Sequence, residues 1–193
     1  MREQEAEPGW LDEDGLWWCV QGGNAAIRPA WFRALVSVMS AADRVQALRR
    51  HEFAVAVDDF GGWIEARHAS GFRLVGGSSL LTAALCYWEH YDPQFASSAA
   101  QHARQQEAFQ HAYKKVQAVG HAELGEPTMQ GRDHDEFRHR WSAWRIGEVL
   151  LAVHQAVGDV QFGLSLQIDA RRYPSNAALD PQSPFLDWMW RIP

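Results

Sequence analysis

The residue types best suited to chemistry in this 193-residue chain fall into short clusters, and the densest cluster offers metal ligands. Asp133, His134, Asp135 and Glu136 follow one another, and His139 lies three residues further on. Zinc sites usually present His or Cys in pairs at fixed offsets, and this cluster meets no such spacing. A solvated polar loop is therefore the simpler interpretation, and we expect no metal or other cofactor.

Two other arrangements carry carboxylates. Glu107 and His111 lie four residues apart, as ligands of helical-bundle metal sites do, but no second pair accompanies them. An exposed contact between neighbouring helical turns accounts for that spacing. Asp58 and Asp59 could form a carboxylate pair, but general acid-base catalysis needs two such groups facing a pocket, and the sequence offers no mate. A turn built by aspartate and the following glycines is the simpler account.

No complete catalytic set accompanies these clusters. The chain has no nucleophile elbow, no phosphate-binding glycine loop and no paired Cys/His signature. Cys19 and Cys86 are its only cysteines, too few and too far apart for a disulfide framework, so we expect reduced thiols. We therefore nominate no catalytic residue, and the sequence favours a binding protein over an enzyme.

The elements that position these residues follow from hydrophobic periodicity, which is fullest in residues 139–169. Apolar and polar or small residues alternate from 161 to 169, as in a strand with one dry face. Gly147-Glu148 and Gly158-Asp159 each stand between aliphatic residues and suit two-residue hairpin turns, where glycine adopts a positive φ. The segment predicts three antiparallel strands. The alternating apolar residues are Phe162, Leu164, Leu166 and Ile168.

Two-residue turns predict the register of these strands. Trp144 then lies opposite Leu151, Leu151 opposite Leu166, and Val149 opposite Ile168, so the apolar side chains share one face. On the outer face, Trp141 lies opposite His154, with Gly163 on the other side of His154. Because Gly163 has no side chain to cover the imidazole, we expect the ring to be open to a ligand or partner. His154→Ala would then leave stability nearly unchanged.

The remaining elements predict an α+β fold. A second three-stranded meander is expected at 52–75, and Thr128 to Asp135 is expected to be a polar loop. The two antiparallel meanders would pack against helices. Two arrangements remain open: a single domain over 15–193 with one continuous sheet, or two similar halves, about 15–92 and 93–170. The expected helices cover residues 29–50 with a break near Ser40, 79–91, and 98–119 with Gly120 as the stop.

Charge and length exclude several classes of protein. Residues 1–14 hold six acids and one base, so we expect an acidic flexible arm, while the other 179 residues hold 18 acids and 17 bases. The body therefore neither mimics nucleic acid nor carries the basic stripe that binds it. The chain begins without a secretory signal pattern, and its longest nearly apolar run, Leu80 to Trp88, is too short to span a bilayer. We expect a cytoplasmic protein.

Tryptophan is the other compositional signal. Ten tryptophans suit a protein that presents a recognition face. The tail, 171–193, ends in an aromatic cluster that includes Trp188 and Trp190. Such a tail either docks on its own chain or inserts into a groove of a partner.

One resemblance is carried by the long helix, the run Leu124-Gly125-Glu126-Pro127, and a strand opened by Trp141 and Trp144. Over residues 98–170 this layout resembles bacterial immunity proteins encoded beside polymorphic or contact-dependent toxins. The resemblance implies tight binding to one cognate toxin and no catalysis. It carries over no functional residue.

Two hypotheses follow. The first is a non-catalytic protein-binding module, immunity-like, whose acidic arm speeds encounter with a basic toxin domain. The second is an enzyme or small-molecule binder with a pocket between sheet and helices. The candidate partner-binding residues are Trp141, His154, Asp58, Asp59, Trp188 and Trp190.

Overall fold

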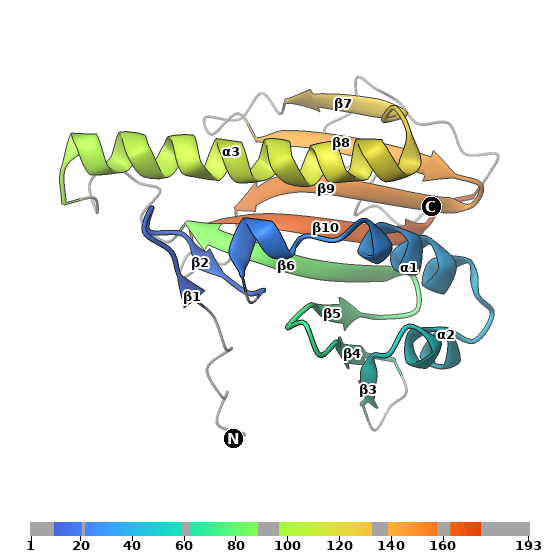
Figure 1. Cartoon of the computed structure of the whole chain (residues 1–193). Coiled ribbons are helices and arrows are strands. Elements are labelled where there is room, and N and C mark those ends of the chain that lie inside the picture. The colour runs from blue at the N-terminus through green and yellow to red at the C-terminus, as the bar shows by residue number, and fades with distance from the viewer. Residues whose placement is uncertain are drawn as a thin grey trace.

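A computed structural model describes residues 10–20, 22–58, 62–88, 97–132, 139–157 and 163–174 of the chain. In this part of the chain, ten strands form one antiparallel sheet, so the expected α+β class is confirmed (Figure 1). The main path runs β3-β4-β5-β6-β10-β9-β8-β7, and β2 pairs with both β1 and β6. The strands are β1 (Trp10–Leu11), β2 (Trp17–Trp18), β3 (Ala54–Val57), β4 (Ile64–Arg67), β5 (Arg73–Gly76), β6 (Leu80–Trp88), β7 (Met129–Arg132), β8 (Arg140–Ile146), β9 (Val149–Val157) and β10 (Leu164–Arg172).

The described helices lie on one face of the sheet (Figure 1). The expected break near Ser40 is confirmed, because Asp43 accepts a hydrogen bond from Gln46 N (2.9 Å) and begins a new helix. Ser98 begins the long helix in the same way, accepting from Gln101 N (3.1 Å). No described helix is both long and apolar enough to cross a membrane. The helices are α1 (Pro29–Ser40), α2 (Arg44–Arg50) and α3 (Ala99–Leu124), with a 3-10 turn at Gly23–Ala26.

The expected stop of the long helix at Gly120 is wrong, since α3 continues to Leu124. A Cβ at Gly120 would lie 2.9 Å from both Phe32 and Trp144, so this glycine allows α3 to pack closely against α1 and β8. The helix ends at Gly125, whose φ of 83° is a conformation that glycine adopts easily.

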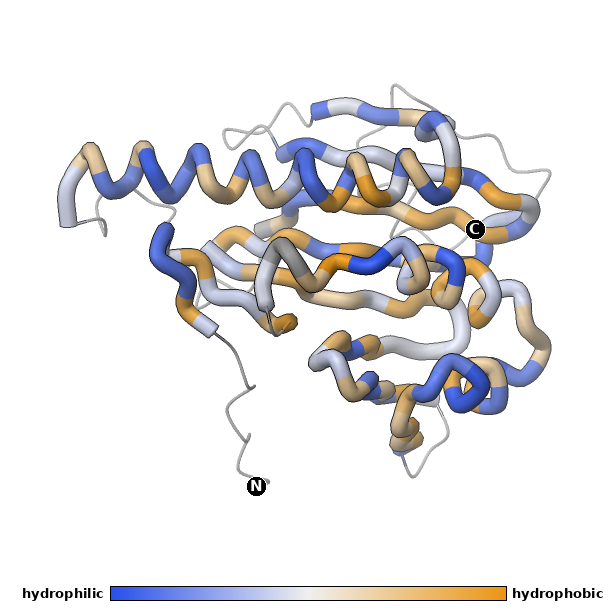
Figure 2. Tube along the Cα trace, in the orientation of Figure 1, coloured by the Kyte–Doolittle hydropathy of each residue, from blue (hydrophilic) through white to orange (hydrophobic). Residues whose placement is uncertain are grey.

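The main core lies between the helices and the sheet. Trp144, Leu151 and Leu166 all belong to it, which confirms that the meander residues share one dry face. Figure 2 shows hydrophobic stretches along the central strands, whereas hydrophilic residues recur along α3. Tertiary packing of apolar faces therefore stabilises the helices, because a helix gains most of its stability in this way.

The β8–β9 hairpin follows the predicted register. Trp144 pairs with Leu151 and Trp141 with His154. Gly147, with a φ of 59°, makes the two-residue turn with Glu148. Glycine at this position meets the conformational demand of the turn.

The predicted β9–β10 register is wrong by four residues. Val149 pairs with Arg172 rather than Ile168, and Val153 pairs with Ile168. The last described pair joins Val157 and Leu164, which are separated by six residues rather than two. The expected Gly158-Asp159 turn lies outside the described residues. Because four is an even number, every side chain keeps its predicted face.

Two segments differ in type from the sequence-based expectation. Residues 79–91 were expected to be helical, but Leu80–Trp88 is the strand β6, paired with β5 and β10. The run is apolar in almost every position, so it fits a stripe of period 3.6 as well as a strand buried on both faces. The expected polar loop after Thr128 contains β7, whose four residues pair with β8. The meander expected at 52–75 is confirmed as β3, β4 and β5.

Candidate interaction surface

Trp141 and His154 lie side by side, as the register predicted, on the face of the sheet away from the helices. The expectation that the imidazole is open is wrong, because His154 is only 1% exposed. Its neighbour on β10 is Gln167 and not Gly163, owing to the shifted register. A partner cannot reach this ring in the present structure.

His154 instead belongs to a buried polar pair. Its Nε2 lies 2.8 Å from Oδ2 of Asp169, whose side chain is fully buried. The next polar side chains along the same face of β10 also interact, since Gln167 Nε2 donates to Ser165 Oγ (2.6 Å). The alternation in the sequence predicts that these residues form the solvent side of a half-buried strand. No local signal distinguishes a solvated polar row from a buried one.

The carboxylate of Asp58 accepts hydrogen bonds from the backbone a few residues further along the chain. Its Oδ1 accepts hydrogen bonds from the backbone N–H groups of Gly62 (2.8 Å) and Trp63 (3.1 Å). This is the turn chemistry expected of aspartate beside glycine. Four other candidate segments or residues lie outside the described part of the chain: Asp59, the loop 133–136, Trp188 and Trp190.

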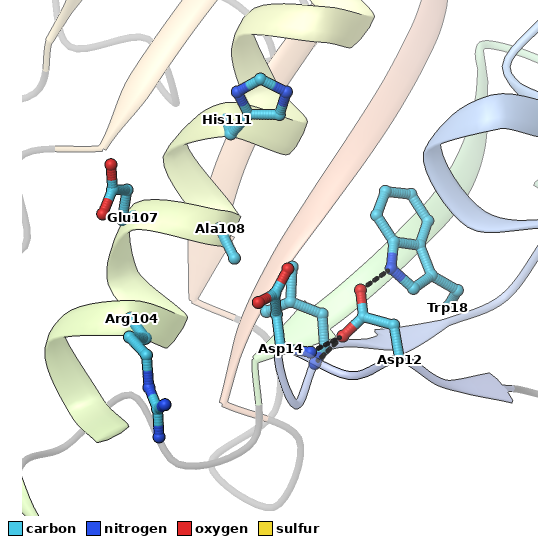
Figure 3. Close-up of a pocket in the computed structure, with 8 residues that line it drawn as sticks. Asp12, Asp14, Trp18, Arg104, Glu107, Ala108 and His111 are labelled. Carbon is cyan, nitrogen blue, oxygen red and sulfur yellow. Dashed lines mark hydrogen bonds between the residues drawn. The ribbon is translucent and has the colours of Figure 1, made fainter. Parts of the chain in front are cut away.

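Glu107 and His111 line a hollow of about 290 Å³ between α3 and the turn before β2 (Figure 3). The carboxylate of Asp12, on the opposite wall, is already engaged, because it accepts from Leu16 N (2.8 Å) and Trp18 Nε1 (2.7 Å). Among the described residues, no group of three or more His, Cys, Asp or Glu side chains could hold a metal ion. Glu107 and His111 therefore have no third such side chain grouped with them in the described part of the chain.

Exposed large apolar side chains of the described residues lie at two places, Trp10 (40%) and Leu11 (65%) on the two-residue strand β1, and Val57 and Trp63 at the edge strand β3. Val57 is 43% exposed and Trp63, just before β4, is 53% exposed. Apart from β4, no described strand pairs with β3, so within the described residues one side of its backbone carries no ladder. The four residues of β3 alternate alanine and valine and include no charge or proline.

Hydrogen-bond alternation identifies which groups point outward from β3. Asp58 N donates to Trp63 O (3.0 Å), so these two residues form a hydrogen-bonded pair. In an antiparallel ladder such pairs alternate with non-bonded pairs. Ala56 and Ala54 therefore bond to β4, whereas the N–H and C=O groups of Val55 and Val57 point away from the sheet.

The strand at the other end of the main path, β7, differs from β3 in its side chains. The strand β7 carries Arg132 and Gly131 in an exposed stretch, both unfavourable for further strand pairing. Natural proteins protect sheet edges with charges, prolines or bulges, because an unprotected edge pairs with other chains. β3 lacks these protections, and with four residues it offers a longer ladder than the two-residue edge strand β1, so it is the described edge best suited to receive another strand.

Searches of protein-family models, of curated proteins and of solved structures found no match to this chain.

Proposed function

We propose that the protein is a non-catalytic binding module that receives an extended segment of a protein partner along β3. The observation that carries the proposal is the exposed, uncharged edge formed by Val55 and Val57. In strand addition, main-chain hydrogen bonds provide affinity and alternate side chains provide specificity. The biological form that we propose is neutralisation of a cognate bacterial toxin in the cytoplasm, which is the role that the immunity-protein resemblance implies.

The exposed apolar side chains at this edge lie on opposite faces of the sheet. Val57 pairs with the buried Ile64 and therefore lies on the helix side of the sheet. Trp63, one residue earlier, lies on the opposite side, because successive side chains alternate. An incoming strand would thus lie directly beside Val57, whereas Trp63 stands one strand further in and could be reached on the opposite face only by a long side chain.

Val57→Lys tests this proposal by placing a charge beside the outward-pointing backbone groups. Val57→Thr is the matched control, since threonine is also β-branched and carries no charge. The wild type and the threonine variant should each co-purify with a stoichiometric protein partner from the native host. The lysine variant should lose at least nine-tenths of that partner while its unfolding midpoint stays the same.

Hydrogen exchange gives a second readout. In the complex, the amides of Val55 and Val57 should exchange at least tenfold more slowly, because each gains an acceptor. The amides of Ala54 and Ala56, already bonded to β4, should change little. Equal recovery of the partner by the lysine variant, or unchanged exchange at both valines, would contradict binding at this edge.

A further inference from the structure

The face of the sheet away from the helices is buried over β8–β10, although no described helix covers it (Figure 1). Leu150 and Ala152 of β9 are 0% exposed on this face, and Tyr173, just after β10, is 7% exposed. A bare sheet face would leave these side chains open to water, so another part of the same chain must cover them. They belong to a second apolar cluster, made of Trp141, Ala143, Leu150, Ala152 and Tyr173, with Leu80 and Met129 packed against it.

The polar side chains of this face are buried in the same way. Arg171 is only 4% exposed, and arginine is almost never so buried unless it has partners. Arg171, Trp141 and Tyr173 each make a further interaction within the chain, and so does His154 in addition to its contact with Asp169. These contacts are typical of an interior layer and not of a face in water.

The chain leaves β10 at one end of the second cluster. Tyr173 N donates to Glu148 O (2.8 Å), in the turn between β8 and β9. Arg145 of β8 donates from Nη2 to Pro174 O (2.5 Å), and its guanidinium lies 5.4 Å from the centre of the Tyr173 ring. These contacts direct the chain across the β8–β9 hairpin on the face away from the helices. Residues 175–193 therefore start beside the cluster.

Three loops leave the sheet at the far end of this face. Residues 89–96, 133–138 and 158–162 each follow or precede a strand at the end marked by Val157. From there to Leu150 is roughly 23 Å along β9, at about 3.3 Å per residue. Loops of this length, held at both ends, reach about 15 Å or less. They therefore cannot cover the end of the cluster at which the chain leaves β10.

Composition separates the two ends of the chain. Residues 1–9 hold three glutamates and one large apolar side chain, Met1. Residues 175–193 can extend roughly 60 Å, which is enough to cross three strands. Burial of apolar surface drives packing, so this segment has the side chains that the cluster needs. Its large apolar residues are Phe185, Leu186, Trp188, Met189 and Trp190.

We propose that residues 175–193 bind across β8–β10 as a third layer, with the aromatic group 185–190 packed on the second cluster. Of the two fates that the sequence leaves open for the tail, this is docking on its own chain and not insertion into a partner. The proposal is independent of strand addition at β3, which lies at the other end of the main path from β7. Its tests use the purified chain without any partner, so the two proposals can fail separately.

Proteolysis tests whether the tail is docked. Chymotrypsin cleaves after aromatic residues, which include Phe185, Trp188 and Trp190. In the native chain, cleavage at these sites should be at least a hundredfold slower than in a synthetic peptide of residues 175–193. The reason is that the protease must wait for the segment to leave the sheet. Equal cleavage rates in the chain and in the peptide would overturn the proposal.

Two adjacent leucines test which face the tail covers. Leu150 and Leu151 are both 0% exposed, but Leu150 belongs to the second cluster and Leu151 to the main core. Either leucine changed to alanine should raise the unfolding equilibrium constant at least tenfold, because a cavity remains. In a chain that carries Trp188→Ala and Trp190→Ala, the effect of Leu150→Ala should fall at least fivefold. Leu151→Ala should keep its full effect there, since only residues in contact are coupled.

Urea unfolding followed by far-ultraviolet circular dichroism measures these constants without depending on the removed indoles. If Leu150→Ala keeps its full effect in the chain without Trp188 and Trp190, the tail does not cover this face and the proposal is wrong. The chymotrypsin comparison uses the unsubstituted chain, so it decides the question even where the doubly substituted chain fails to fold.

Discussion

The buried pair of His154 and Asp169 shows how far one side chain's role depends on its surroundings. Their side chains are 1% and 0% exposed and lie 2.8 Å apart in the centre of the sheet. Removing one member of a buried polar pair leaves the other without its partner in a medium that solvates it poorly. The main energetic effect of the pair is therefore the loss of folding stability when only one of its two side chains is removed.

His154→Ala should accordingly lower the free energy of unfolding by about 3 kcal/mol, the opposite of the expectation for an open ring. Chemical denaturation monitored by tryptophan fluorescence measures this change. His111→Ala, on the exposed side of α3, is the control and should stay within about 0.5 kcal/mol of the wild type. If His154→Ala and His111→Ala have equal free energies of unfolding, the buried pair does not contribute to stability.

The helices and strands are joined by contacts that cross long stretches of sequence. Arg172, the last residue of β10, donates from Nε to Met39 O (3.0 Å) and from Nη2 to Ala41 O (2.6 Å). These carbonyls lie at the end of α1, where backbone acceptors lack intrahelical partners and a cation is favourable. One side chain thus connects the end of the central strand to the end of a helix.

Arg172→Met should lower the free energy of unfolding by about 1 kcal/mol, because two charge-assisted hydrogen bonds are lost at a site that water partly reaches. Arg132→Met, on the exposed edge strand β7, provides the matched control and should change stability by less than about 0.5 kcal/mol. Thermal and urea unfolding would both report the difference. A neutral Arg172→Met variant would mean that water replaces these contacts without loss.

The main path of the ten-stranded sheet consists of two runs of four strands that meet at their last members, β6 and β10, with β1 and β2 outside this path. Helices precede each run: α1 and α2 come before β3, and α3 comes before β7. Burial raises the pKa of Cys19, Cys86, Tyr87 and Tyr113.

These shifts predict loss of stability in alkali. Each group has a higher pKa in the folded state, so above pH 9 the unfolded chain releases protons that the folded chain retains. These four groups should therefore add no pH dependence below about pH 8, and the free energy of unfolding should fall as the pH rises from 9 towards 12. Urea titrations at several pH values measure this slope. Cys19→Ala should make it shallower, and an unchanged slope would show that Cys19 does not contribute.

Local pattern was sufficient for a large part of this fold. The break in the helices near Ser40, the start of the long helix near residue 98 and the turn at Gly147 depend on neighbouring residues, so the printed sequence predicts them. The same is true of the face shared by Trp144, Leu151 and Leu166, since a strand's period of two survives any even shift of register.

Other features were decided only by tertiary structure. Leu80–Trp88 fits two periodicities, and it becomes a strand because β5 and β10 supply its hydrogen-bonding partners on either side. The β9–β10 register, and with it the neighbours of His154, depends on pairing across the full length of both strands. Burial of the polar row and exposure of the β3 edge likewise depend on which segments pack together. Packing between distant segments is a property of the folded chain that no local pattern encodes.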